Sequence, residues 1–589
     1  MHKDVRVAVP THWGDGFGSD IAAQHIARAQ EVFGAQILAV LAAPEYPTDV
    51  PILVIESRNL VALMLQLKST YTFLADITAT DEGETGQWGR FEVVYQLFAP
   101  REKSRLRVKT AAHEGAMVPS LAHIWSGANW AEREVYDMFG VRFCGHPDMR
   151  RILMDYRWVG HPLRKDYPLK GYQLFPDAAP INPDLLQMEE QVLGHDSDEL
   201  WDNADLLVNI GPTHPTTHGA LRMCARLRGE TIETSYCEFG YTHRAKEKLG
   251  ENRTYHNFIV YTDRLNYCSS LINNVAYVMT VEKLMGIGVP DRCVWIRMIV
   301  SEIARIIDHL ICVGINAVDL GAFSYFLYGY HQREEAYTLI EKLCGARLTT
   351  SYTRVGGLMA DAPEGFEREV KEWVRRTRVV IDEMHALLTN NKIWRQRTEG
   401  VGVFTREQCM DYSVSGPCAR AAGIDIDLRR DQPYLFYKNV EFDVPVCGSG
   451  DVFDRYLVRI AEIRESLNII TQCADRMKSG PIWTEDKRVR IPDKDSVHNT
   501  MEGMIHHFKF FMEGFQVPPG EAYSQVEAAN GELGFYIVSR GGPRAHRMRI
   551  RGPSFWNFQT LAAMVRGQKV ADMVAALGSI NVIAGELDR

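Results

Sequence analysis

ADLLVNIGPTHPTTHGALRMCARL, residues 204–227, predicts two β-strands joined by a stiff turn. An apolar run precedes the turn, and after it apolar residues alternate with arginines, which is the period of a strand. Two prolines in GPTHPTTHG (211–219) fix their own backbone angles and favour extended geometry at the residues before them. The turn therefore holds two histidines, His214 and His218, at low entropic cost, as suits a site on a rigid scaffold.

Metal binding is the least supported role for these histidines. Zinc needs further ligands at suitable spacing, and the neighbouring residues supply none. The chain has eleven cysteines but no CxxC pair, and its closest two, Cys409 and Cys418, are nine positions apart. This pattern argues against a disulfide framework and a cysteine-held iron–sulfur centre, and it is typical of a reducing compartment. The histidines then either hydrogen-bond the turn itself or face a ligand.

Composition indicates a soluble globular protein of several domains. The chain has 589 residues, of which 46% are hydrophobic and 24% charged, and this length predicts roughly three or four domains. A formal net charge of −9 argues against nucleic-acid binding. No apolar run reaches the roughly 18 residues of a membrane span, and the nearest candidate is interrupted by Asp319. A membrane location would therefore require a partner.

The pattern along the chain predicts two structural regions. Strand-like segments at 51–57, 91–99 and 104–112 and a helix at 59–68 indicate an α+β domain near the N-terminus. Residues 172–200 are rich in proline and acids with weak periodicity, which predicts a linker. After it come the strand–turn–strand segment and a mainly helical region.

A helix is predicted over 263–286, DRLNYCSSLINNVAYVMTVEKLMG. Asp263 suits an N-cap and Gly286 a helix stop. Tyr267 then falls in the first turn, where its phenol can donate a hydrogen bond or a proton. The alternative is a tyrosine at a packing edge.

A second helix is predicted over 301–321, with an apolar stripe and an opposite polar stripe that runs from Glu302 to Asp319. Such a polar stripe is typical of a solvated face, although this one could also begin a proton path. Asp319 lies at the C-terminal end, where the helix dipole disfavours an anion. It is therefore a candidate functional residue, or it pairs with an arginine.

Two further stretches are basic. Residues 241–256, YTHRAKEKLGENRTYH, predict a helix, and a charge run of this kind is usually a solvated face. Residues 540–552, RGGPRAHRMRIRG, predict a half-buried strand whose basic outer face could bind a partner.

Taken together, these motifs resemble a known family. GPTHPTTHG, HRAKEKL, DRLNY, VDLGA, SYTRVGG and the terminal GELDR, in this order, resemble the D subunit of respiratory complex I. Residues 130–171, from WAEREVYDMFG to KDYPLKG, resemble the signature of the C subunit. The chain therefore resembles the fused C/D subunit of bacterial NADH–quinone oxidoreductase over nearly its whole length. The resemblance implies an α+β domain at 1–171, a linker at 172–200, and at 201–589 a mixed, mainly helical domain with β-sheet elements.

The resemblance also implies a site. In this family the D part lies in the peripheral arm, on the cytoplasmic side of the bacterial inner membrane, next to membrane-arm subunits. With the B subunit, which holds the terminal [4Fe–4S] cluster, it forms the cavity where quinone is reduced; the chain itself is expected to bind no cofactor or metal. By resemblance, His218 and Tyr267 contact the quinone head group and Asp319 partners the histidine. Arg244 and Arg264 are expected near the cluster.

The D part is also similar to the large subunit of nickel–iron hydrogenases, whose two CxxC pairs bind the metals. Here the corresponding regions, FGYTHRAKEK and VIAGELDR, lack cysteine, which argues strongly against hydrogenase activity. Many family members carry a histidine where this chain has Thr349, so the terminal cluster is expected to have a lower, weakly pH-dependent potential. Two alternatives stay open: a docking scaffold without catalysis, and a quinone reductase with an electron donor other than NADH.

Overall fold

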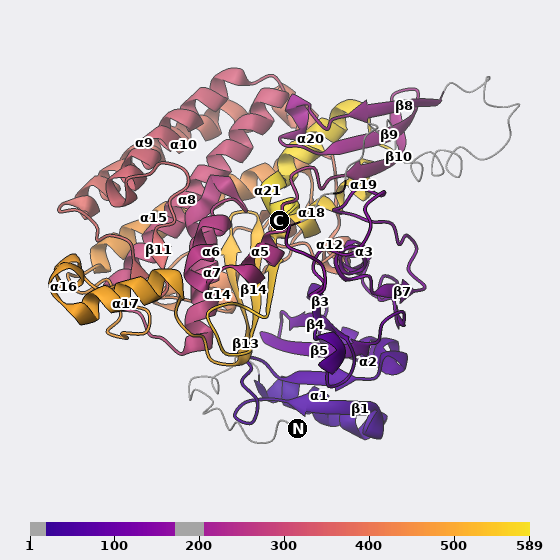
Figure 1. Cartoon of the computed structure of the whole chain (residues 1–589). Coiled ribbons are helices and arrows are strands. Elements are labelled where there is room, and N and C mark those ends of the chain that lie inside the picture. Colours follow the sequence, from indigo (N-terminus) through magenta and orange to yellow (C-terminus); the bar gives the residue numbers. More distant parts are fainter. Residues whose placement is uncertain (1–18, 171–172, 174–204) are drawn as a thin grey trace, which may run out of the picture.

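The computed structural model describes residues 19–170, 173 and 205–589. The predicted linker, 172–200, falls almost wholly outside these described residues. Figure 1 shows a five-stranded sheet at one end of the molecule, long helices at the other, and a small sheet between them. Among the described residues, no helix is both long enough and apolar enough to cross a bilayer.

The N-terminal region is an α+β domain, as predicted. Its sheet has the order β1-β2-β5-β4-β3, antiparallel except for the parallel pair β2–β5. The strands are β1 (Ile37–Leu41), β2 (Ile52–Ile55), β3 (Phe73–Asp81), β4 (Phe91–Ala99) and β5 (Ser104–Ala112). The helices are α1 (Ser19–Phe33), α2 (Leu60–Lys68) and α3 (Ala128–Phe139), and short β6 (Met117–Pro119) pairs with β7 (Arg142–Cys144). The three predicted strands and the predicted helix are confirmed.

The strand–turn–strand prediction is also confirmed. β8 (Asp205–Ile210) and β9 (Arg222–Arg228) are antiparallel, and β10 (Thr231–Glu238) completes a three-stranded sheet. The turn between β8 and β9 contains the short 3-10 helix η5 (Pro215–Thr217).

The helical region is built around one buried helix, α8 (Asp291–Asp319). The longer helices around it are α7 (Ser270–Met285), α9 (Phe323–Cys344), α10 (Phe366–Thr389), α15 (Val452–Arg476) and α20 (Val570–Ile580). The other helices of this region are α5 (Lys246–Asn252), α6 (Tyr255–Thr262), α11 (Lys392–Thr398), α12 (Arg406–Asp411), α13 (Pro417–Ala421), α14 (Leu428–Asp431), α16 (Lys494–Asn499), α17 (Met501–Met512), α18 (Pro553–Phe558), α19 (Leu561–Val565) and α21 (Ala584–Leu587). Further 3-10 turns are η2 (Gly34–Gln36), η3 (Ser57–Asn59), η4 (Gly83–Thr85), η6 (Tyr267–Ser269) and η7 (Tyr437–Asn439), and β11 (Thr353–Arg354) pairs with β12 (Gly357–Leu358).

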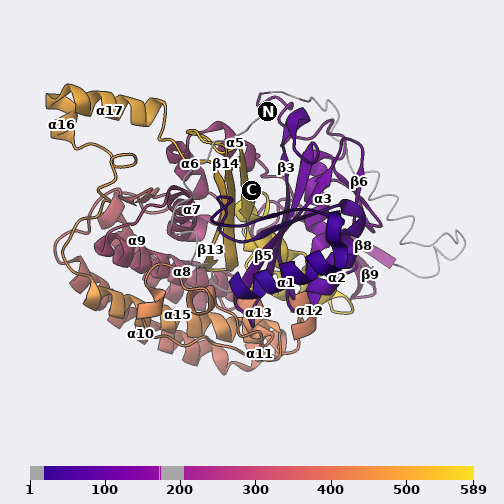
Figure 2. The same ribbon diagram turned by 90° about the horizontal axis from the view of Figure 1, so that it is seen from below.

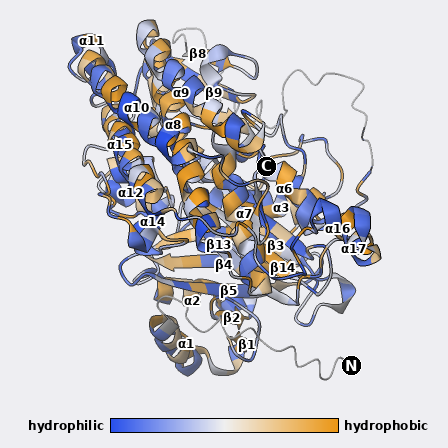
Figure 3. Cartoon of the chain, turned by 90° about the vertical axis from the view of Figure 1, so that its left-hand side faces the viewer, coloured by the Kyte–Doolittle hydropathy of each residue, from blue (hydrophilic) through white to orange (hydrophobic). Residues whose placement is uncertain are grey.

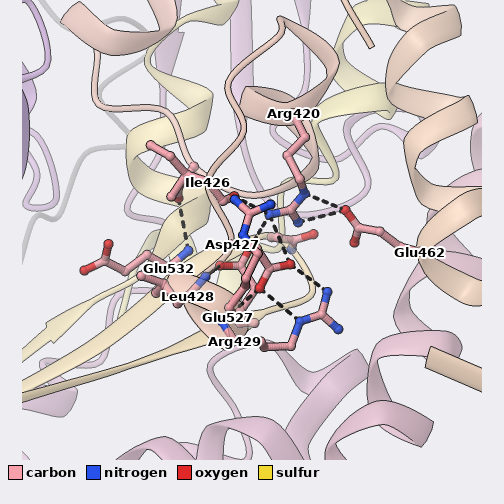
Figure 4. A network of polar contacts seen from close by, with 12 residues as sticks. Arg420, Ile426, Asp427, Leu428, Arg429, Glu462, Glu527 and Glu532 are labelled. Atoms are coloured by element: carbon pink, nitrogen blue, oxygen red, sulfur yellow. Dashed lines mark hydrogen bonds and ion pairs between the residues drawn. The ribbon is translucent and has the colours of Figure 1, made fainter. Parts of the chain in front are cut away.

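The polar stripe of α8 is not a solvated face. Glu302, Arg305 and His309 are fully buried. His309 Nε2 lies 2.9 Å from Glu462 Oε2, and the other carboxylate oxygen of Glu462 accepts from Arg420. Figure 4 shows this Glu462–Arg420 contact within a larger network of buried ion pairs. The interpretation as a solvated face is therefore wrong, because acids and arginines of other elements, not water, satisfy the stripe.

The small sheet β13 (Gly520–Ala528), β14 (Gly531–Ser539) and β15 (Arg547–Arg551) joins the two regions. Its three β15 arginines, predicted to form a basic outer face, are almost completely buried. Arg549 donates to both carboxylate oxygens of Asp76 at 2.8 Å, while Arg547 and Arg551 donate to the β3 backbone oxygens of Ala79 and Ala75. The predicted strand is therefore confirmed, but its half-burial and its basic outer face are wrong: the arginines pack against the N-terminal domain of the same chain.

Candidate functional site

Hydrogen bonds within the 211–219 turn hold it together. The His214 Nδ1 atom accepts from the backbone N–H of Thr216 at 3.2 Å, so His214 caps η5 and its ring serves the loop. The Thr217 hydroxyl lies 2.7 Å from the carbonyl oxygens of both His214 and Gly219. His218 then ends η5 in the left-handed region, with φ of 53°. This backbone turns the His218 side chain away from the loop.

The structure brings His218 and Asp319 together. His218 Nε2 lies 2.7 Å from Asp319 Oδ2, although 101 positions separate the two residues. Their side chains are 18% and 14% exposed, so the pair is partly accessible to solvent and does not lie in the core. Asp319 is the last residue of α8 and takes a histidine, not an arginine, as its partner. One carboxylate thus fixes the orientation of the imidazole and leaves its Nδ1 atom facing outward from the pair.

Tyr267 is held by a different contact with α8. The helix predicted from Asp263 actually begins at Ser270, because Asp263 follows α6 and its carboxylate accepts from Asn274 and Ser351. Gly286 does end the helix, in the left-handed conformation. Tyr267 instead starts η6, whose N-cap is Asn266.

Asn266 sets the position of this tyrosine. Its side-chain oxygen accepts from the Cys268 N–H at 3.1 Å, and its amide nitrogen donates to Asp308 Oδ2 at 2.6 Å. Tyr267 is half-buried; burial, helped by the charges of Cys268 and Asp308, raises the pKa of its phenol. Its hydroxyl has no hydrogen-bond partner within the described part of the chain. Asp308 and Asp319 are separated by eleven residues, roughly 16 Å along the helix. The two halves of the predicted site are thus attached to different turns of one helix.

The C-terminal helix α21 packs against both halves. A Cβ atom on Gly219 would lie 2.9 Å from the Ala584 side chain, so the turn approaches α21 closely. A Cβ on Gly585 would lie 2.5 Å from the Arg264 carbonyl oxygen and 2.7 Å from that of Leu265. The motif with His218 and the motif with Tyr267 therefore contact adjacent residues of α21. Figure 1 shows the C-terminus between the helical region and the small sheets.

The basic stretch 241–256 is anchored to the same C-terminal segment. Asp588 accepts from the backbone N–H groups of Gly240 and Thr242, at 3.0 and 2.8 Å. Lys246 Nζ donates to the carbonyl oxygens of Arg264 and Gly585, at 2.7 and 2.8 Å. Burial lowers the pKa of Lys246 to about 8. The expectation of a solvated helix is wrong here, because Lys246, Glu247 and Lys248 are all buried.

Arg244 and Arg264 lie on either side of this anchor. Both are exposed, and neither has an ion-pair partner among the residues that the structure describes. The loop with Thr349 is held nearby, because Ser270 donates to the Leu348 carbonyl oxygen and Ser351 donates to Asp263. Thr349 itself is exposed. Exposed guanidinium groups without an ion-pair partner among the described residues suit contact with an anionic or electron-rich partner.

The sequence patterns did not indicate two buried acids near the Tyr267 turn, Asp308 and Glu586. Asp308 is fully buried and accepts from the amides of Asn266 and Asn581, each at 2.6 Å. Glu586, also fully buried, accepts from the backbone N–H and the hydroxyl of Ser554. Burial raises the pKa of Glu586 to about 7, and the charge of Asp308 adds to the shift. For Glu586, the sequence offered only the terminal GELDR motif, and this motif does not show which groups its glutamate contacts.

The described residues contain no group of three or more His, Cys, Asp or Glu side chains arranged to hold a metal ion.

Two family models match this chain. Residues 53–173 match the 30 kDa subunit of respiratory-chain NADH dehydrogenase, and residues 319–589 match its 49 kDa subunit. The C/D subunit of NADH-quinone oxidoreductase from Bdellovibrio bacteriovorus is 43% identical over 534 residues, which cover 91% of this chain and 94% of that relative. The chain belongs to the C/D subunits of NADH-quinone oxidoreductase.

Other relatives of this C/D-family chain show the same division. The C/D 2 subunit of NADH-quinone oxidoreductase from Aquifex aeolicus is 40% identical, over 89% of this chain and 92% of the relative. The D subunit of NADH-quinone oxidoreductase from Geobacter sulfurreducens is 48% identical over 384 residues, which are 65% of this chain but 98% of the relative. The predicted family is confirmed, and a D-type sequence alone accounts for about two thirds of the C/D chain. The domain boundaries at 171 and 200 stay predictions.

Proposed function

We propose that this chain is the quinone-site subunit in the peripheral arm of a proton-translocating NADH–quinone oxidoreductase. In this proposal His218, Asp319 and Tyr267 form one side of the cavity in which the quinone head group is reduced. The observation that carries it is the His218–Asp319 contact of 2.7 Å, made by two side chains that are partly exposed and lie neither in the core nor free in solvent. Packing alone does not require an imidazole whose orientation is fixed by a carboxylate.

The chemistry needs hydrogen-bond donors at both oxygens of the head group. Two-electron reduction of a quinone places negative charge on these oxygens, and donors stabilise that charge and supply protons. His218 would act at one oxygen through Nδ1, while Asp319 holds Nε2 and fixes the orientation of the ring. The Tyr267 hydroxyl, which has no partner within the described residues, would act at the other. The raised pKa of this phenol keeps it protonated, and therefore a donor, at neutral pH.

Electrons would come from a [4Fe–4S] cluster held by the neighbouring B subunit. Arg244 and Arg264 are the side chains of this chain proposed to face that cluster, since both are exposed and lack partners among the described residues. The remaining partners would be membrane-arm subunits, with the chain peripheral on the cytoplasmic side of the inner membrane. NADH is the proposed electron source of the whole complex, by analogy with the relatives' names.

The D-like part is proposed to share its fold with the hydrogenase large subunit. The two regions that hold metal-binding cysteines in that enzyme are in direct contact here, since the Thr242 N–H donates to Asp588 at 2.8 Å. In this chain threonine, histidine and aspartate side chains occupy these regions. This contact supports a common scaffold whose metal site has been replaced by hydrogen bonds.

The Tyr267→Phe variant in the assembled complex tests the proposal. The variant keeps the ring and removes only the hydroxyl, so quinone reduction should fall by about 10²–10⁴-fold if Tyr267 donates a proton. Tyr328→Phe, an exposed tyrosine on α9, is the matched control and should leave the rate unchanged. The docking-scaffold alternative predicts a normal rate for Tyr267→Phe in complexes that contain all their subunits in normal amounts. The rate of quinone reduction with NADH is then compared with the rate with reduced ferredoxin. This comparison distinguishes an NADH-driven complex from one that uses a different electron donor.

A further inference from the structure

The helices α16 and α17 form an arm that has little contact with the rest of the chain. Figures 1 and 2 both show them at the edge of the molecule, and in the second view they stand clear of the helical bundle. α16 has no buried residue, and α17 has two, Gly503 and Phe510. The Phe510 ring packs against His256 with 4.9 Å between ring centroids, and Gly514 follows against Thr254. The Phe511 ring also packs edge-on against His256, at 5.5 Å, so two neighbouring aromatic side chains fasten the arm to the body.

The solvent side of α17 is apolar. Met501, Met504, Ile505, Phe508 and Phe511 are 73%, 55%, 45%, 61% and 37% exposed. Their positions follow the i, i+3, i+4, i+7 spacing that places residues on one helix face. Figure 3 shows hydrophobic colouring on this outlying helix. The arm is therefore an amphipathic helix turned with its apolar face outward.

A helix of this kind is poorly stabilised without a partner. α17 has twelve residues, and isolated helices shorter than about 12–15 residues are marginal in water. Most helix stability in proteins comes from packing of the apolar face, and within the described part of the chain only Gly503 and Phe510 of α17 are buried. Contiguous exposed apolar side chains are also the usual mark of an interaction surface. The arm has the features of a segment that is completed by another molecule.

The charges of the arm select among possible partners. Residues 493–513 carry four carboxylates and two lysines, which leaves a net charge of −2 with histidines neutral. Helices that lie on membranes are rich in lysine and arginine, which anionic lipids attract. A negative arm would be repelled by such a surface, and by a second negative arm. A protein groove with an apolar floor and basic rims is complementary to it.

We propose that the face formed by Met501, Met504, Ile505, Phe508 and Phe511 docks into an apolar, basic-rimmed groove on another polypeptide of the complex. The relatives of this chain are named as subunits, so such a polypeptide is available to it in the cell. The docked arm would give this chain an attachment to the complex that is independent of the quinone site.

Amide hydrogen exchange of the full chain tests this proposal. Exchange over residues 493–513 is measured in the isolated full-length chain, in the detergent-purified complex, and in the isolated chain with phosphatidylglycerol vesicles. The expected result is exchange at least about tenfold slower in the complex than in the isolated chain, with no protection by vesicles or by raised protein concentration. Equal exchange in the isolated chain and the complex overturns the proposal. So does protection by vesicles alone, which indicates a membrane surface, or by concentration alone, which indicates a second copy.

A charge on the apolar face provides the second measurement. Ile505→Asp with Phe508→Asp should lower the amount of this chain recovered in the complex by at least about tenfold, because unpaired charges would enter an apolar groove. The same change at Val379 and Leu387, which are 53% and 54% exposed on α10, is the matched control. Circular dichroism and the melting temperature of the isolated variants show that the body still folds. Recovery equal to the control overturns the proposal, and because recovery is measured without quinone, it leaves the quinone-site assignment untouched.

Discussion

Replacing Arg549 with methionine should strongly destabilise the contact between the two parts of the chain. Arg549 is 2% exposed and makes two 2.8 Å hydrogen bonds to Asp76 of β3. It also lies 2.5 Å from Glu134 of α3 and 3.3 Å from Glu247 of α5. One guanidinium thus neutralises carboxylates from three elements, and methionine fills its volume without a charge.

The loss of stability depends on the carboxylates that stay buried after Arg549 is replaced. Removing one partner of a buried ion pair costs about 3–5 kcal/mol, since the remaining charge stays buried without compensation. Arg547 and Arg589 still contact Glu247 and Glu134, but Asp76 loses both of its side-chain hydrogen bonds from Arg549. We therefore expect the free energy of unfolding to fall by about 3–5 kcal/mol at pH 7, measured by urea titration of the full chain. Arg375→Met, in an exposed ion pair with Glu372, is the control and should leave the urea midpoint unchanged.

The pH dependence gives a second, independent check. Burial alone would raise the pKa of Glu247, but Arg547, Arg549 and Arg589 outweigh it and lower that pKa to about 2. A carboxyl whose folded pKa is lowered adds stability above its unfolded value of 4.5, and this stability is lost as the pH falls toward 2. Without Arg549 the carboxylates can take up protons sooner, so the penalty of the variant should shrink below pH 4.5. A penalty below about 1 kcal/mol at pH 7, or one that is the same at pH 7 and about pH 4, would refute this account of the interface.

Two further predictions concern the site. Gly585→Ala would place a Cβ 2.5 Å from the Arg264 carbonyl oxygen, so it should cost about 1–3 kcal/mol and displace the Tyr267 turn, whereas Gly288→Ala, with nothing within 4 Å, should be silent in the same thermal unfolding assay. Thr349→His should raise the midpoint potential of the terminal cluster in the assembled complex and add a pH slope of up to about 59 mV per unit, while the unaltered chain shows little slope in redox titrations at several pH values. A steep slope in the unaltered chain would contradict the second prediction, and equal melting of the two glycine variants would contradict the first.

Local patterns predicted the parts of the fold that depend on local physics. Strands β4, β5 and β9 follow from residues that alternate within a few positions, and β8 follows from a short apolar run. Gly286 ends α7 because a left-handed residue is needed there, with φ of 66°. The start of that helix was misplaced because Asp263, a good N-cap by type, is used by a loop 88 residues away. Side-chain type alone does not show which backbone group a carboxylate will cap.

The buried charges could not be predicted for the same reason. A polar stripe on α8 and a basic strand at β15 look solvated when each is considered alone, because charged side chains usually face water. Arg549 is buried because Asp76 lies 473 positions away in sequence and next to it in space. The pattern of one element contains no information about a partner at that separation. A basic strand and the acids that neutralise it can be interpreted correctly only together.

In the candidate site, the motifs predicted the residues but not the contacts that support them. The resemblance implied that Asp319 partners His218, and the structure places the two side chains in contact at the end of α8. The structure also shows that three motifs, with His218, Lys246 and Tyr267, all contact the segment 584–589. The sequence patterns of the turn, the basic stretch and η6 do not predict these contacts. Each pattern describes a few neighbouring residues, whereas the contacts join all three motifs to one distant segment. We infer that GELDR positions the other motifs, since Gly585 leaves no room for a Cβ and the carboxylates of Glu586 and Asp588 accept hydrogen bonds from the backbone N–H groups of Ser554 and Gly240.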